Sequence, residues 1–159
     1  MKKFVVPKPY SGGLILNFRC NCECKQCMYL GSPKWKDDWI SNKKLESILL
    51  KLSKYIKASP YGREHVSLNY GLHFTGGEPF LNYENLLNAI KIAHNLKIPS
   101  LFVETNCYWC ENDEITKQRL LELKNNGLNG ILISVNPFIL EYIPFERTER
   151  AIIISMEIF

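Results

Sequence analysis

The feature that most constrains the fold is a fourfold alternation of short apolar runs and amphipathic segments along the 159 residues. Short apolar runs are typical of buried strands, whereas apolar residues three and four positions apart indicate helices. The predicted strands are residues 14–18, 72–74, 101–105 and 131–135. The predicted helices are residues 42–56, 83–98, 113–126 and 145–159. Such alternation builds βα units, so we expect an α/β fold with a parallel sheet and right-handed crossovers.

The last predicted helix, residues 145–159, is the least clear of the eight elements. Phe145, Ile152, Met156 and Phe159 are spaced as in a helix, whereas the consecutive isoleucines at 152–154 would also suit a strand. Its glutamates and its lack of turn signals favour a helix.

Composition narrows the class of protein. With 46% hydrophobic and 23% charged residues, the chain is typical of a globular protein, and we expect a single domain over residues 1–159. Pro7 interrupts the N-terminal apolar run, and no apolar stretch approaches the roughly 20 residues of a membrane span. Basic and aromatic residues do not alternate as on a nucleic-acid platform. We therefore expect a cytoplasmic protein with neither a membrane nor a nucleic acid as partner.

Reactive or polar residues follow each of the four predicted strands. Cysteines follow the first strand, and Gly76, Gly77, Glu78 and Pro79 follow the second. The third strand ends at Glu104 and Asn106, and the fourth at Ser134 and Asn136. Ligands bind at the carboxyl edge of the strands in parallel α/β folds. The sequence therefore predicts one site, built by four loops at that edge.

Four of the six cysteines lie between Cys20 and Cys27, a density that points to metal binding. In a reducing cytoplasm, clustered thiols are metal ligands more often than disulfides. Cys20, Cys24 and Cys27 form a C-x3-C-x2-C pattern that could wrap an iron–sulfur cluster and leave one iron open. A zinc site is the alternative, because Cys107 and Cys110 supply a second C-x2-C pair.

The segment Thr75–Pro79, TGGEP, favours the cluster over zinc. Two glycines allow a ligand to approach the backbone closely. Together with the Glu78 carboxylate, they suit a ligand that carries an ammonium group. A zinc site has no use for this element, although Gly-Gly is also common in an ordinary strand-to-helix turn.

With these motifs in this order, the chain resembles the radical S-adenosylmethionine (SAM) enzymes. The resemblance rests on Cys20, Cys24 and Cys27 and on GGEP after the next strand. The segments ETN at 104–106 and ISVNPF at 133–138 are similar to the third and fourth strand ends of that family. The implied fold is a partial parallel (β/α) barrel, of which about four βα units are present.

The resemblance also implies the cofactors and their ligands. The three cysteines would bind a 4Fe–4S cluster whose open iron is chelated by SAM. The backbone of Gly76–Pro79 and the Glu78 carboxylate would hold the SAM amino group. Glu104, Asn106, Ser134 and Asn136 would face the ribose or the carboxylate of SAM. Reductive cleavage of SAM would then give a 5′-deoxyadenosyl radical that abstracts hydrogen from a small-molecule or peptide substrate, with reduced flavodoxin or a ferredoxin-type protein as electron donor.

Some positions depart from the family pattern. Gln26 stands where an aromatic residue usually packs near the adenine, so it would hydrogen-bond the base instead or face solvent, and Tyr29 could substitute. Cys22 has no family role, and we expect it not to bind the cluster. Cys107 and Cys110 are expected to pack in the core or at its rim.

The largest departure is length, because the family barrel normally has six strands and only four are visible. The C-terminal part of the barrel would then be missing, or another chain completes the sheet. Two alternatives to an active enzyme follow. One is a non-catalytic zinc or iron–sulfur module, with zinc held by Cys24, Cys27, Cys107 and Cys110. The other is a truncated inactive product that only binds the cluster.

Overall fold

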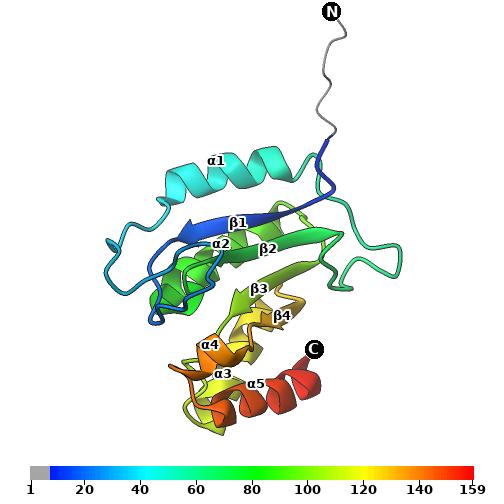
Figure 1. Cartoon of the computed structure of the whole chain (residues 1–159). Helices are drawn as coiled ribbons and strands as arrows, with labels where there is room; N and C mark the ends of the chain where they lie inside the picture. Colours follow the sequence, from blue (N-terminus) through cyan, green and yellow to red (C-terminus); the bar gives the residue numbers. More distant parts are fainter. Residues whose placement is uncertain (1–7) are drawn as a thin grey trace, which may run out of the picture.

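The computed structural model describes residues 8–159 and contains one four-stranded sheet (Figure 1). All pairs are parallel, and the strand order β1-β2-β3-β4 follows the chain. The strands are β1 (Ser11–Asn17), β2 (Gly71–Gly76), β3 (Leu101–Thr105) and β4 (Gly130–Ile133). The predicted α/β fold with about four βα units is confirmed.

Helices connect the strands around the outside of the curved sheet (Figure 1). They are α1 (Asn42–Leu52), the short 3₁₀ helix η1 (Pro79–Asn82), α2 (Tyr83–Asn95), α3 (Asp113–Asn125), α4 (Pro137–Leu140) and α5 (Phe145–Ile158). Helix α1 packs against α2, whereas α5 packs against both α3 and β4. The helices therefore leave the carboxyl ends of the strands to the connecting loops.

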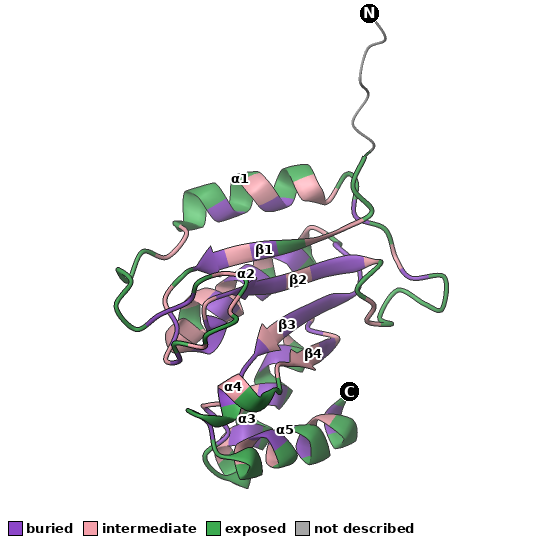
Figure 2. Ribbon diagram, viewed as in Figure 1, coloured by how far each residue is buried: buried purple, intermediate pink, exposed green. Residues whose placement is uncertain are grey.

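The main core lies between the sheet and these helices (Figure 2). Alternate strand residues point into it, among them Leu14, Leu72, Phe74 and Val103, as the period of two in a strand requires. The helices contribute the fully buried residues Leu45, Leu49, Leu86, Ile90, Leu120 and Leu123. Each such aliphatic side chain contributes roughly 1.5–3 kcal/mol through its removal from water.

The element boundaries agree with the predictions to within a few residues. Strand 101–105 is found as predicted, and α3 ends ahead of Gly127, whose φ of +104° is left-handed. Two details were wrong. Helix α1 ends at Leu52 rather than at residue 56, so Tyr55 lies beyond it and is exposed, and α4 was missed.

Residues 145–158 form helix α5, as predicted, but the stripe that indicated the helix does not face the core. Phe145, Ile152, Met156 and Phe159 are exposed. The buried face carries Thr148, Ala151, Ile154 and Ile158 instead. Helix α5 thus has two apolar faces, and only one of them is covered in the described chain.

Within residues 8–159, no helix combines the length and apolar character that a membrane span needs. The prediction made from Pro7 and the residues before it lies outside the described part of the chain.

Candidate functional site

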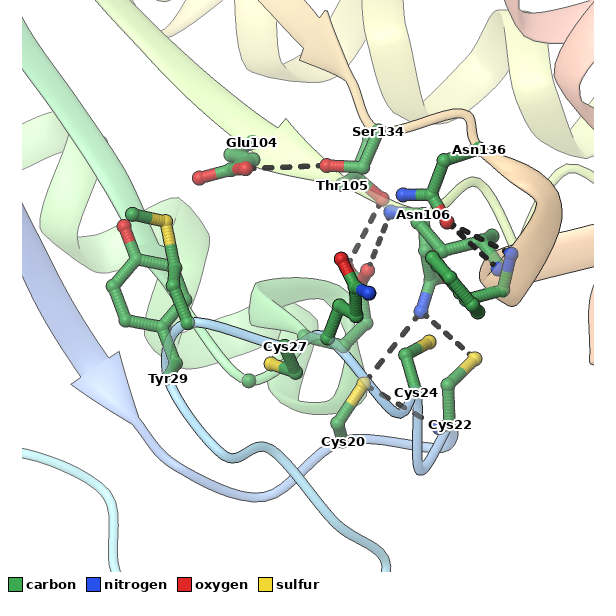
Figure 3. A pocket seen from close by; sticks show the side chains of 17 residues that line it. Cys20, Cys22, Cys24, Cys27, Tyr29, Glu104, Thr105, Asn106, Ser134 and Asn136 are labelled. Atoms are coloured by element: carbon green, nitrogen blue, oxygen red, sulfur yellow. Dashed lines mark hydrogen bonds between the residues drawn. The ribbon is translucent and has the colours of Figure 1, made fainter.

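A cavity of about 350 Å³ opens at the carboxyl ends of the strands (Figure 3). It brings together every predicted metal- and cofactor-binding residue except Pro79, which is buried at the start of η1. These residues are Cys20, Cys24, Gln26, Cys27, Gly76, Gly77, Glu78, Glu104, Asn106, Ser134 and Asn136. Residues far apart in the sequence thus share one wall, as the four strand ends predicted. The role of each residue in binding a cofactor stays a prediction.

The cysteine loop, residues 18–41, follows β1 directly and forms one side of the cavity. A turn closes it locally, because the N–H of Cys27 donates to the carbonyl of Cys24 at 3.1 Å. Backbone donors also reach two sulfurs: Gly31 N–H donates to Cys27 Sγ at 3.3 Å and Cys22 N–H to Cys20 Sγ at 3.4 Å. The loop therefore shapes a sulfur-rich surface from its own backbone.

The donor set at this surface fits an iron–sulfur cluster. Cys20, Cys24 and Cys27 are unpaired thiols on one loop, and all three line the same cavity. Thiolates are the ordinary ligands of such clusters. A single zinc ion would draw its sulfurs to within about 4 Å of one another, and no group of three ligands in residues 8–159 is arranged to hold one ion.

Cys107 and Cys110 do not line the cavity with the other thiols. Both are fully buried in the main core, as expected, beside Trp109, which stacks on Phe80 at 4.1 Å between ring centroids. The set of Cys24, Cys27, Cys107 and Cys110 proposed for zinc is therefore not brought together by this fold.

The glycine pair after β2 joins this strand to the cysteine loop. Gly76 has a φ of +131°, and Gly77 donates its N–H to the carbonyl of Asn17 at 3.0 Å. A Cβ atom at Gly77 would overlap the carbonyl oxygen of Arg19. The two glycines are therefore required by the close approach of the loop, independently of any ligand.

Glu78 is 1% exposed and its carboxylate already accepts three hydrogen bonds. Oε1 accepts from Phe80 N–H and from Thr105 Oγ1, both at 3.0 Å, and Oε2 accepts from Asn106 N–H at 2.8 Å. Burial raises the pKa of this carboxyl to about 8, although these donors act in the opposite direction. Since a carboxylate accepts about four hydrogen bonds, Glu78 mainly joins the GGEP turn to the end of β3.

Glu104 connects three strand ends across the mouth of the cavity. Thr75 Oγ1 donates to Glu104 Oε2 at 2.6 Å, and Ser134 Oγ donates to Oε1 at 3.1 Å. Because β2, β3 and β4 each supply one of these side chains, the carboxylate is fixed in direction. It presents a negative group with spare acceptor capacity to the cavity.

Two asparagines complete the polar wall, and each uses one end of its amide locally. The Asn136 side-chain oxygen caps α4 by accepting from the N–H groups of Phe138 and Ile139. Asn106 Oδ1 accepts from Tyr108 N–H at 3.0 Å, and its Nδ2 points at the cysteine loop (Figure 3).

Five residues that line the cavity were not singled out for binding: Cys22, Met28, Thr105, Phe138 and Ile139. Of these five, only Thr105 could have been predicted from the sequence, because it lies between Glu104 and Asn106 at a strand end. His73, a residue of β2, stacks on Phe102 with ring centroids 5.1 Å apart. Burial lowers its pKa, and it does not line the cavity.

With this geometry established, the chain can be placed among known proteins. It belongs to the family of 4Fe-4S single cluster domains, whose model matches residues 14–137. A solved structure described as native anSMEcpe with bound AdoMet has the same fold, with a TM-score of 0.59 and 20% sequence identity. The similarity covers 92% of this chain and 41% of that one. No curated protein matches the sequence.

The family match confirms the predicted 4Fe–4S cluster, and the fold shared with the AdoMet-bound structure agrees with the resemblance to radical SAM enzymes. The match spans the cysteine loop, the GGEP turn and the ends of β3 and β4, which are the parts that build the cavity. The chain spans less than half the length of the solved relative.

Proposed function

We propose that this chain is the cluster- and SAM-binding part of a radical SAM enzyme. The observation that carries the proposal is the single cavity that joins three cysteines of one loop to the GGEP turn and to polar groups at the ends of β3 and β4. The family model and the fold shared with an AdoMet-bound structure support it.

In this proposal Cys20, Cys24 and Cys27 hold a 4Fe–4S cluster. The carbonyl groups of the GGEP turn accept from the ammonium group of SAM, and Glu104 and Ser134 Oγ accept from its ribose hydroxyls. Gln26 and Tyr29 line the same cavity, and they would face the adenine. When bound, the cluster supplies the electron that cleaves SAM to methionine and a 5′-deoxyadenosyl radical, which takes a hydrogen atom from the substrate.

The chain's own residues contribute orientation and electrostatics, as proteins do around reactive cofactors. Glu104 is held by donors from β2 and β4, so it cannot swing away when the ligand enters. We extend the proposal to a small-molecule or peptide substrate, a flavodoxin or ferredoxin-type electron donor and a cytoplasmic location. The donor would meet the exposed outer side of the cysteine loop, where Lys25 and Lys36 are exposed.

Low-temperature EPR tests the proposal directly. The chain is reconstituted anaerobically with iron and sulfide, reduced with dithionite and measured with and without SAM. A 4Fe–4S signal whose g-values change with SAM supports the proposed site. A cluster signal whose g-values do not change on addition of SAM would mean that this chain binds the cluster but not SAM, as the truncated-product alternative states.

A second measurement separates binding from chemistry. The reduced, SAM-loaded chain is incubated and analysed for 5′-deoxyadenosine and methionine. Production of both supports reductive cleavage by the chain itself. A protein that holds zinc and no iron after the same treatment would contradict the cluster assignment.

A further inference from the structure

Asn106 makes contacts that the proposed function does not explain. Its amide nitrogen Nδ2 lies 3.7 Å from Cys20 Sγ, 3.4 Å from Cys22 Sγ and 2.9 Å from Asn21 Oδ1 (Figure 3). The resemblance assigned this side chain to the ribose or the carboxylate of SAM. The structure instead directs its donor end at the base of the cysteine loop.

The direction of this amide is fixed by the rest of the residue. Oδ1 accepts from Tyr108 N–H, and the backbone N–H donates to Glu78. Since Oδ1 serves as an acceptor, the two hydrogens of Nδ2 must face the loop. One points at Asn21 Oδ1, and the other is shared by Cys22 Sγ at 3.4 Å and Cys20 Sγ at 3.7 Å.

The surroundings of Asn106 make the contact rigid. The side chain is 7% exposed, and Thr105, the residue before it, binds Glu78, Cys107 N–H and the Trp109 indole. Arg147 of α5 donates to the carbonyl of Tyr108. The donor is therefore held by β3, by the GGEP turn and by α5, not by the loop that it contacts.

From this geometry we infer that Asn106 is a positioning residue that fixes Cys20 and tunes the reduction potential of the cluster through an N–H···S hydrogen bond. The inference rests on the proposed function, because it concerns the cluster that Cys20 would bind. Hydrogen bonds to the sulfurs are one determinant of iron–sulfur potentials. A donor stabilises the more negative, reduced form and so raises the potential.

Cys20 Sγ would then receive two donors of different origin. Cys22 N–H belongs to the loop and moves with it, whereas Asn106 Nδ2 belongs to β3 and is set by the fold. The second donor couples the position of the cysteine to the wall that is proposed to bind SAM. A merely structural asparagine would stabilise the loop but would leave the potential of the bound cluster unchanged.

Two variants separate these roles. Asn106→Ala removes the donor, and Asn106→Asp removes it while keeping the oxygen that accepts from Tyr108. The matched controls are Asn136→Ala and Asn136→Asp, which change an asparagine of the same cavity that also caps a turn but contacts no sulfur. A charge at position 106 would lie closer to the sulfurs than a charge at position 136, so the neutral alanine pair, rather than the aspartate pair, reports the lost donor.

The potential is measured by EPR-monitored redox titration of the reconstituted chain without SAM, and iron release to a chelator is timed in parallel. We expect lower potentials for both Asn106 variants than for their Asn136 counterparts. We also expect iron release to be about tenfold faster, at the lower end of the effect of removing groups that orient metal ligands.

The outcomes distinguish this inference from the proposed function. If the wild type assembles a cluster and each Asn106 variant has the potential of its Asn136 control, the inference is overturned while the proposed function stands. If the wild type assembles no cluster, both are overturned. Should Asn106→Ala fail to fold, the neutral variants Asn106→Leu and Asn136→Leu, whose side chains have nearly the size of asparagine and carry no donor, decide the matter.

Discussion

At the scale of single residues, the buried carboxylate of Glu78 connects the carboxyl end of β2 to the carboxyl end of β3 through hydrogen bonds. Its three acceptor contacts replace hydration that the cavity wall excludes. A buried polar group without its partners costs about 1–3 kcal/mol. This carboxylate therefore matters for folding as well as for any ligand.

We expect Glu78→Gln to lower the free energy of unfolding of the metal-free chain by about 1–3 kcal/mol. The amide has the size of the carboxylate, but its NH₂ end cannot accept, so at least one of the hydrogen bonds from Phe80, Thr105 and Asn106 is lost. Urea denaturation followed by circular dichroism measures the change. The control is Glu111→Gln on the exposed surface, and equal stability of the two variants would contradict the role of Glu78.

The cysteines of the loop differ in their expected roles. Cys24→Ala should abolish the cluster, because it removes one of three ligands, whereas Cys22→Ala should retain it. Iron and sulfide content and the brown absorbance of the reconstituted variants measure both. An intact cluster in Cys24→Ala would show that the ligand set has been assigned incorrectly.

His73 gives the chain a predictable response to acid. Because burial lowers the pKa of the folded imidazole, the unfolded chain binds more protons near its ordinary value of about 6.5. The contribution of His73 to the free energy of unfolding is therefore fully present above pH 6.5 and is lost as the pH falls below this value. The negative charge of Glu104 raises the pKa of His73 and so limits the lowering caused by burial.

We expect the free energy of unfolding of wild type to fall between pH 7.5 and 5.5, and to fall less in His73→Phe. Phenylalanine keeps the stacking on Phe102 but cannot be protonated. Urea titrations at both pH values measure the two slopes. Parallel slopes in the two proteins would show that His73 does not cause the acid sensitivity.

At the scale of elements, α3 and α5 show how a buried hydroxyl can stabilise or destabilise. Thr116 is the fourth residue of α3 and Thr148 is the fourth residue of α5, and both are fully buried. Thr116 Oγ1 donates to the carbonyl of Asn112 at 2.7 Å. Thr148 Oγ1 has no hydrogen-bond partner within residues 8–159.

The same substitution should therefore have opposite effects in the two helices. Thr148→Val removes an unpaired hydroxyl and is expected to stabilise the chain by about 1 kcal/mol, whereas Thr116→Val is expected to cost about 1 kcal/mol. Thermal or urea unfolding of the pair provides the measurement. Similar changes in both variants would argue that packing, not hydrogen bonding, sets the balance.

Much of the fold was predictable at this scale because periodicity and turn residues are local signals. Strand 101–105 was identified correctly, and α3 ends at Asn125, one residue before its predicted end. Helix α4 was missed because a single turn capped by Asn136 has no periodicity. The exposed face of α5 was not foreseen because both of its faces are apolar, and only tertiary packing decides between them.

The composition of the cavity was also predictable, since the ends of parallel strands share one edge. The individual contacts were not. Asn106 was expected to face SAM, and its contact with a sulfur 86 positions away depends on the orientation of two loops. The partners of Glu78 likewise come from the folded backbone, which no spacing in the sequence reveals.

At the scale of the whole molecule, the strand edge of β4 is exposed to possible partners. The outer edge of β4 has no neighbouring strand in residues 8–159, and Met156 and Phe159 of α5 lie next to Gly130 and Ile131 at this edge. An unpaired edge beside exposed apolar side chains favours association with another chain.

We expect the isolated chain to self-associate as its concentration rises, and Met156→Lys to weaken this association. Met156 is 80% exposed, so a charge there should leave the fold intact. Leu50→Lys is the matched control, because Leu50 is also exposed, at 52%, but lies on α1. Sedimentation velocity measures the mass distribution, and an equal effect of both lysines would contradict a role for the β4 edge.

The anchoring of the cysteine loop has a thermodynamic consequence. Metal sites whose ligands lack order without the ion spend binding energy on folding, so chelators unfold such proteins. Here the loop is tied to the GGEP turn by the hydrogen bond from Glu78 N–H to the carbonyl of Arg19, and to Asn106 through Asn21. Because these bonds do not pass through a cysteine side chain, we expect the chain to keep its fold when a chelator removes the iron and to accept a new cluster afterwards.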